Sequence, residues 1–211
     1  MTWDTNTKKI APPQAVATRS AEQEENKDEA PAEKPFAKKP ILVFIESADD
    51  TGANDKVANI VFDNNKVILG SRFFKCVRMS AADAENDALL RDSGKKLPRI
   101  VMITPDYEIG KVVQGKVKAG DVYKAMKAVA KKSYKGNFER NVKALLKLPA
   151  DYDSLNAELK VLKAKKEKGL KPNEVKKVNK KIADLEDQQK KLEERQAELL
   201  KMDLKGPKTA A

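Results

Sequence analysis

The chain has 211 residues, a length that allows one domain plus an appendage, and 43 basic against 32 acidic residues give a net charge of +11. Charged residues make up 36% and aromatic residues 5%, which is too polar for one compact domain throughout, so we expect some solvated helix or disorder. The single cysteine excludes a disulfide framework and a structural zinc site, and the absence of histidine excludes histidine-based catalysis. No apolar run is long enough to span a membrane.

The first 40 residues lack hydrophobic periodicity and, from Ala11 to Pro40, are rich in Pro, Ala, Glu and Lys. Such a segment buries too little apolar surface to offset its ordering entropy, so we predict a disordered N-terminal segment over residues 1–40. Trp3 is either a loosely held terminal residue or an anchor onto the following domain. No apolar leader follows the first residues, so we expect no signal peptide and favour a cytoplasmic location.

Residues 41–133 have the pattern of an α/β domain. We predict four strands from apolar or alternating runs of strand length: residues 41–45, 73–79, 99–104 and 109–117. We predict three helices from the spacing of apolar side chains: residues 57–64, 81–91 and 122–130. Asn54 or Asp55 is the expected cap of the first helix, and the short turn at 105–108 favours antiparallel pairing of the last two strands. The predicted order is β-α-β-α-β-β-α.

This order, with the motif Lys96-Leu97-Pro98-Arg99-Ile100-Val101, resembles the thioredoxin-like fold of bacterial proteins whose first strand follows a Lys-Pro pair, here Lys39-Pro40. The resemblance covers roughly residues 39–133. It implies a cis peptide bond at Pro98 and a loop at Leu97 and Pro98 that pairs its backbone with an extended peptide. The alternative is an ordinary trans proline at the start of a strand.

The resemblance also implies where the redox dithiol of the family would lie, and this chain lacks it. Asp50 and Ala53 occupy the two cysteine positions, which excludes thiol–disulfide exchange there. We expect Cys76, on the predicted second strand, to be a small buried hydrophobic residue, with peroxide sensing or dimer formation through its thiol as the alternatives.

The loop around Asp50 has two other interpretations. Asp50-Thr51-Gly52 matches the triplet of aspartic proteases, and Val67-Ile68-Leu69-Gly70 is similar to a second element of that family, although the long helical patterns argue against a mostly β protease. Four carboxylates either bind Ca²⁺ or Mg²⁺ or simply cap a helix: Glu46, Asp49, Asp50 and Asp55. We expect no metal, no cofactor and no catalytic residue.

Residues 134–211 have the pattern of a basic helical extension, with 20 basic and 13 acidic residues. An amphipathic segment from Phe138 is expected to end at Pro149, and a helix capped by Asp153 or Ser154 is expected to end near Gly169. The final helix repeats apolar or Gln side chains at heptad spacing: Val175, Val178, Ile182, Leu185, Gln189, Leu192, Gln196 and Leu199. We predict an antiparallel hairpin or coiled coil that packs on itself, binds a partner or joins two copies of the chain.

Two functions from different classes follow from these patterns. The first is a redox-inactive thioredoxin-like binding or scaffolding module that engages a protein partner through the Leu97–Pro98 edge, the coiled-coil tail or both. The second is a nucleic-acid or ribosome-associated protein that binds through the basic helices of residues 134–211. A solvated, Lys-rich helix surface would explain the same charge without a partner.

Overall fold

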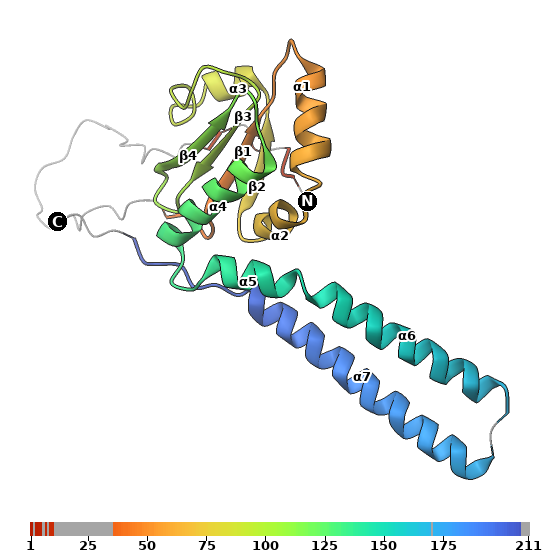
Figure 1. The fold of residues 1–211 in the computed structure, drawn as a ribbon. Coiled ribbons are helices and arrows are strands. Elements are labelled where there is room, and N and C mark those ends of the chain that lie inside the picture. Colours follow the sequence, from red (N-terminus) through yellow and green to blue (C-terminus); the bar gives the residue numbers. More distant parts are fainter. Residues whose placement is uncertain (2, 6, 8, 11–35, 170, 208–211) are drawn as a thin grey trace, which may run out of the picture. The chain divides into compact units, whose positions relative to one another are not determined.

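The computed structural model (Figure 1) describes the chain except residues 2, 6, 8, 11–35, 170 and 208–211. The chain divides into two units, residues 1–136 with 203–211 and residues 137–202. No helix in the described ranges is long and apolar enough to cross a bilayer. Most of the segment predicted to be disordered, residues 11–35, lies outside the described residues.

The first unit is a mixed α/β structure with one four-stranded sheet. Its strands are β1 (Ile41–Ile45), β2 (Lys75–Met79), β3 (Arg99–Ile103) and β4 (Ile109–Gln114). Their order is β2-β1-β3-β4, with β1 parallel to β2 and antiparallel to β3, and β3 antiparallel to β4. The predicted antiparallel pairing of the last two strands is therefore confirmed.

The central strand β1 is buried on both faces, as its unbroken apolar run predicts. Ile41, Val43 and Ile45 pack in a core with Leu90 and the partly buried Leu97. The opposite face carries Phe44, whose ring meets the ring of Phe62 edge-on. Because successive side chains of a strand point to opposite faces, a strand with cover on both sides needs apolar residues at every position.

The described residues of this unit also form the helical segments α1 (Thr51–Lys56), the π-helical turn η1 (Val57–Val61), α2 (Asn65–Ser71), α3 (Ala81–Glu85) and α4 (Ala119–Ser133). The predicted apolar face of the last helix is confirmed, because Val122, Met126 and Val129 are fully buried. In Figure 1, α4 lies across one face of the sheet, where it packs on β3 and β4.

Several predictions for this unit are wrong in detail: the second strand begins at Lys75, not at residue 73, and the fourth ends at Gln114, not at residue 117. The first helix begins at Thr51 with Asp50 as its cap, and Asn54 is a buried residue inside it. Residues 67–70 belong to α2, so the likeness to the second protease element does not hold. The helix expected over 81–91 ends at Glu85, because the side chain of Asp87 bonds to the following backbone and turns the chain.

The first residues of the chain pack on the sheet. The Trp3 ring lies 4.7 Å from that of Phe62 and 6.0 Å from that of Phe44. Asp4 pairs with the free edge of β2: its N–H donates to the Cys76 carbonyl at 2.9 Å, and its carbonyl accepts from the Arg78 N–H at 3.2 Å. These contacts favour Trp3 as an anchor, and Asp4 covers part of an edge that would otherwise offer unpaired backbone groups.

The second unit contains α5 (Phe138–Leu145), α6 (Leu148–Glu167) and α7 (Pro172–Leu200). Helices α6 and α7 form the predicted hairpin, and the break between them falls at Gly169, which has a φ of 81°. The boundary at Pro149 is wrong: this proline lies in the first turn of α6, where its missing N–H costs nothing, so the helix starts before Asp153.

The chain leaves the first unit after Gly136 and returns to it at Asp203. Residues 133–135 and 203–205 pair there as two short antiparallel stretches. The Lys135 N–H donates to the Asp203 carbonyl at 2.9 Å, and the Lys205 N–H donates to the Ser133 carbonyl at 2.8 Å. We call this pairing the clasp.

Candidate functional site

Three chain segments meet at one end of the sheet. In the register of the sheet, Ile45 at the end of β1 lies beside Met79 at the end of β2 and opposite Arg99 at the start of β3. The loop that carries Leu97 and Pro98 therefore enters the sheet at the same end from which the chain runs on toward Asp50. The candidate site consists of this loop and of the side chains that hold it by hydrogen bonds, Asp87, Arg99 and Gln114.

The Leu97–Pro98 peptide bond is cis, as the resemblance implies. The neighbours of Leu97 have backbone partners: the Lys96 N–H donates to Oε1 of Gln114 at 3.2 Å, and the Pro98 carbonyl accepts from the Gly115 N–H at 3.1 Å. Within the described part of the chain, the N–H and the carbonyl of Leu97 itself form no hydrogen bond. Among the described residues, Leu97 thus has an unpaired backbone donor and acceptor, while its neighbours Lys96 and Pro98 are hydrogen-bonded.

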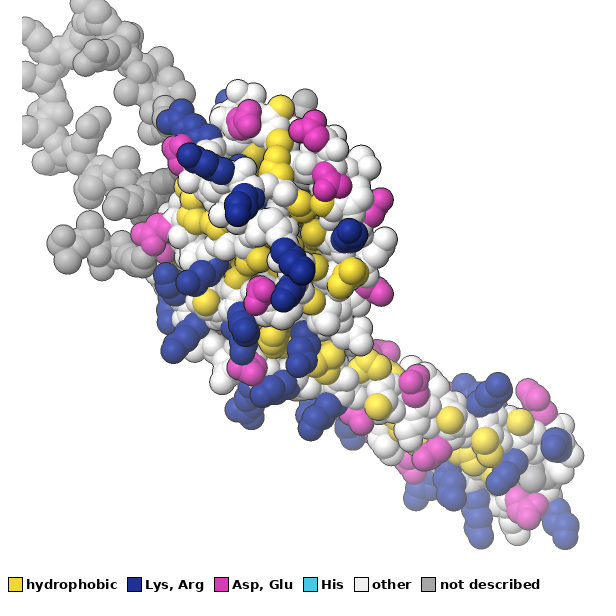
Figure 2. All heavy atoms as spheres, turned by 45° about the horizontal axis from the view of Figure 1, so that its top comes forward, with side chains coloured by type: hydrophobic (Ala, Val, Ile, Leu, Met, Phe, Trp, Pro, Cys, Tyr) yellow, Lys and Arg dark blue, Asp and Glu magenta, His cyan; other side chains and the backbone are white. Residues whose placement is uncertain are grey.

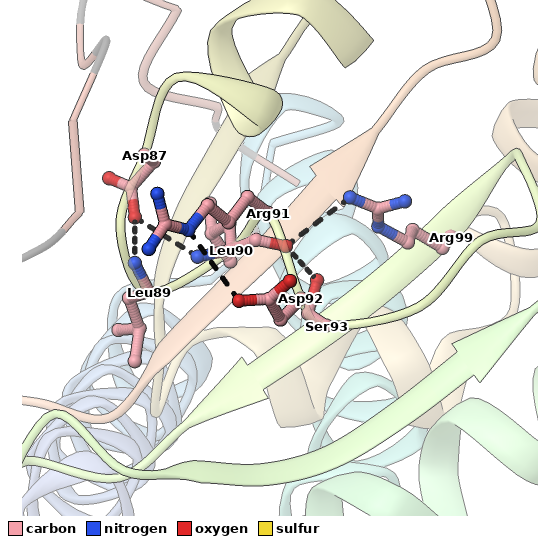
Figure 3. Close-up of polar contacts among 7 residues, drawn as sticks. All are labelled: Asp87, Leu89, Leu90, Arg91, Asp92, Ser93 and Arg99. Carbon is pink, nitrogen blue, oxygen red and sulfur yellow. Dashed lines mark hydrogen bonds and ion pairs between the residues drawn. The ribbon is translucent and has the colours of Figure 1, made fainter.

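The side chain of Arg99, at the start of β3, is bound to the loop that precedes Pro98. Arg99 is 5% exposed, and its guanidinium donates to the Gly94 carbonyl at 2.7 Å. It also donates to the Leu90 carbonyl at 3.4 Å, the contact drawn in Figure 3. Its Nε is buried without a hydrogen-bond partner among the described residues. Burial lowers the pKa of the guanidinium, against the opposing charge of Glu85. The buried side chain of Arg99 therefore fixes residues 90–94 by hydrogen bonds to both ends of this segment.

Asp87 organises the beginning of the same loop. Its carboxylate is almost fully buried and accepts hydrogen bonds from the N–H groups of Leu89 and Leu90, at 2.9 and 3.1 Å, and from that of Ile10. Three backbone donors compensate the burial of this charge. The loop that presents Leu97 is thus held at Asp87 and again at Arg99.

Gly94 is the one position in this loop whose backbone requires glycine. Its φ is 141°, and a Cβ atom there would lie 2.5 Å from Oε1 of Gln114. The missing side chain lets Gln114 lie across the loop and accept the hydrogen bond from Lys96. Glycine here allows β4 to support the approach to Leu97.

Asp50 and Ala53 are joined by the hydrogen bond that caps α1. The Asp50 carboxylate accepts a hydrogen bond from the Ala53 N–H at 2.8 Å. Asn54 then fixes the preceding loop, because its side-chain oxygen accepts from the Ser47 N–H at 2.9 Å and its amide donates to the Ser47 carbonyl at 2.8 Å. The chain that leaves β1 at this end of the sheet therefore leads into a capped helix start.

The acidic residues near Asp50 do not gather around one point. Glu46 forms an ion pair with Arg78, whose pKa this contact raises, and Asp50 caps α1. Among the residues that the structure describes, no three acidic or cysteine side chains are placed to hold a metal ion. Glu46 and Asp50 therefore have structural roles, one in an ion pair and the other in a helix cap.

Cys76 lies in β2 beside Leu42 of β1, and the residue is 7% exposed. Burial raises its pKa to about 12, against a weaker opposing effect of a hydrogen bond to Ser71. A thiol with this pKa is almost entirely protonated at neutral pH and is a poor nucleophile.

Sequence reasoning missed the residues that support the loop. Arg99 carries a weak signal, since it is a charged residue at the start of an otherwise apolar strand, but its carbonyl partners are set only by the folded loop. Gln114, at the end of β4, carries none, because an exposed polar residue is ordinary in an edge strand.

No family model matches the chain, and a search of curated proteins finds no match to it.

Proposed function

We propose that the chain is a redox-inactive thioredoxin-like binding module that pairs an extended segment of a protein partner with the backbone of Leu97. The element order of the first unit and the parallel pairing of β1 with β2 support the thioredoxin-like assignment. The observation that carries the binding function is that the N–H and the carbonyl of Leu97 have no hydrogen-bond partner among the described residues. An extended peptide satisfies both groups by strand-like pairing.

The surroundings of Leu97 fit such a role. Its side chain packs partly into the core, so the backbone of this residue has a defined position. Arg99, Asp87 and Gln114 hold the loop on both sides. A preorganised loop loses less entropy on binding than a flexible one, and this favours useful affinity from a few backbone hydrogen bonds.

Redox inactivity follows from what stands at the dithiol positions. Asp50 and Ala53 carry no sulfur, and the thiol of Cys76 is buried with a raised pKa. This end of the sheet therefore recognises a partner without thiol chemistry.

The test is an array of peptides of varied sequence, incubated with the full chain and with two variants of one residue. Leu97→Ala keeps both backbone groups, whereas Leu97→Pro removes the N–H donor. We expect bound peptides that Leu97→Ala retains and Leu97→Pro loses, with circular dichroism to confirm folding. Amide spectra of the isotope-labelled wild-type chain provide a second readout, in which the bound peptide must shift the Leu97 N–H. An unmoved Leu97 signal on peptide binding, or no bound peptide, overturns the proposal.

A further inference from the structure

Charge is strongly segregated along the helical hairpin. We define the hairpin tip as residues 160–181, the end of α6 and the beginning of α7. It contains ten lysines and two glutamates, a net charge of +8 out of +11 for the whole chain. The rest of the two helices, residues 148–159 and 182–200, contains nine acidic and three basic residues. The hairpin is basic at its tip and acidic toward its base.

The lysines of the tip are available to a ligand. They are all exposed: Lys160, Lys163, Lys165, Lys166, Lys168, Lys171, Lys176, Lys177, Lys180 and Lys181. The ammonium group of Lys163 pairs with Glu186 across the two helices at 3.5 Å, and no other of these ammonium groups forms an ion pair within the described residues. Figure 2 shows lysine side chains projecting around this end of the unit.

Unpaired like charges on neighbouring turns weaken a helix. Lys176 and Lys180 are four residues apart in α7, as are Lys177 and Lys181, and both pairs therefore repel each other. The helix start at Lys171 adds another positive charge where the helix dipole is already positive. A bound polyanion offsets this repulsion. Binding therefore stabilises the tip more than it would stabilise a helix surface on which positive and negative charges alternate.

We infer that the hairpin tip binds the phosphate backbone of nucleic acid without reading its sequence. Duplex nucleic acid carries about one negative charge per 1.7 Å of its axis, a density that a dense cluster of lysines can match. The lysines of α7 from its start to Lys181 extend over about 15 Å of helix, which spans several phosphates. The tip contains no aromatic residue to stack on bases and no Arg, the side chain that most often reads guanine. This inference concerns the second unit and is independent of the proposed peptide binding.

The same features argue against a lipid surface. Helices that lie in a membrane interface need an exposed apolar face. Here α6 and α7 pack on each other with Leu159 and Leu185 buried, and Val161 is the one large exposed hydrophobic side chain of the described part of the tip. The acidic base of the hairpin would also be repelled by an anionic surface that lies along both helices.

The experiment measures binding of the full chain to a fluorescein-labelled duplex of mixed sequence by anisotropy, at about 50 mM and about 200 mM salt. The tip variant carries Lys→Gln at four positions of α7: Lys176, Lys177, Lys180 and Lys181. The matched control carries Lys→Gln at four exposed positions of the first unit: Lys111, Lys116, Lys118 and Lys132. Both variants lose four positive charges, so only the location of the loss differs.

We expect affinity that falls steeply with salt, a loss of more than about tenfold in the tip variant at low salt, and a change within about threefold in the control. The salt dependence of the tip variant should be flatter, by a slope of about 0.9 for each phosphate contact removed. Four results overturn the inference: no binding at low salt, equal losses in both variants, equally tight binding of polyglutamate, or binding to phosphatidylserine vesicles without binding to the duplex.

Discussion

The Asp50 carboxylate and the Ala53 N–H are joined by a 2.8 Å hydrogen bond that caps α1. Replacing Asp50 by Ala leaves this helix start without its side-chain acceptor, so we expect a loss of about 1 kcal/mol in the free energy of unfolding of the first unit. Asp50→Ser keeps an acceptor and should lose less. Urea denaturation followed by the fluorescence of Trp3, the single tryptophan, measures both variants; equal losses would contradict the capping role.

Thiol reactivity tests the state of Cys76. Because its pKa is raised to about 12, we expect reaction with a disulfide reagent at neutral pH to be at least about a hundredfold slower in the folded chain than in urea. We also expect no insulin reduction by the natural chain, and none after Asp50→Cys alone, because exchange and resolution need two sulfurs. Rapid labelling of the folded chain would contradict the burial of this thiol.

Alkaline pH should destabilise the first unit. The folded-state pKa of Cys76, about 12, lies above its ordinary value of 9.0, so the thiol stabilises the fold fully below pH 9 and loses this contribution as pH rises from 9 toward 12. Burial also raises the pKa of Tyr134, which acts in the same direction above pH 10. Urea denaturation at a series of pH values should show this loss, and Cys76→Ala should reduce it; an unchanged pH dependence in that variant would assign the effect elsewhere.

Loss of the Arg99 hydrogen bonds should destabilise the loop before Pro98 more than the rest of the first unit. Arg99→Met keeps most of the apolar contacts but removes the donors to the Leu90 and Gly94 carbonyls, and we expect it to cost about 2 kcal/mol. Amide hydrogen exchange should then increase over residues 88–97 more than in α4. A uniform increase over the whole unit would mean that Arg99 does not act through this loop.

Gly94 and Gln114 offer a double-mutant test. Gly94→Ala places a methyl group 2.5 Å from Oε1 of Gln114 in a backbone conformation with positive φ, and we expect a loss of about 1–3 kcal/mol. In a Gln114→Ala background the contact is gone and only the backbone cost remains, so the loss should be smaller. Equal losses in the two backgrounds would remove Gln114 from the explanation.

Patterns that extend over several residues predict this fold well. The unbroken apolar run of β1 is stable only where both faces of the strand are buried, and the structure buries both. The single apolar face of α4 is stable only against a core, and the structure buries that face. The break between α6 and α7 is similarly local, because Gly169 and Pro172 end and begin helices by their own backbone preferences.

Features that depend on one tertiary contact were not predictable in this way. The segment after Glu85 has helical spacing, yet the carboxylate of Asp87 captures N–H groups that a helix would have used. Proline often marks the end of a helix, but Pro149 lies in the first turn of α6. A shift of the helix boundary by one turn separates these two cases, and the sequence pattern does not fix a boundary that closely. At the candidate site, the motif around Pro98 indicates the loop, whereas Arg99 and Gln114 acquire their roles only when β3 and β4 bring the loop together.

The clasp has a mechanical consequence. Since residues 133–135 hold residues 203–205 within the first unit, a force that pulls on the two ends of the chain passes across the hydrogen bonds of the clasp before it can reach residues 137–202. The intervening helices form a side branch that carries no tension until the clasp opens. A stretching experiment should therefore release the length of the second unit only after the break of this short pairing.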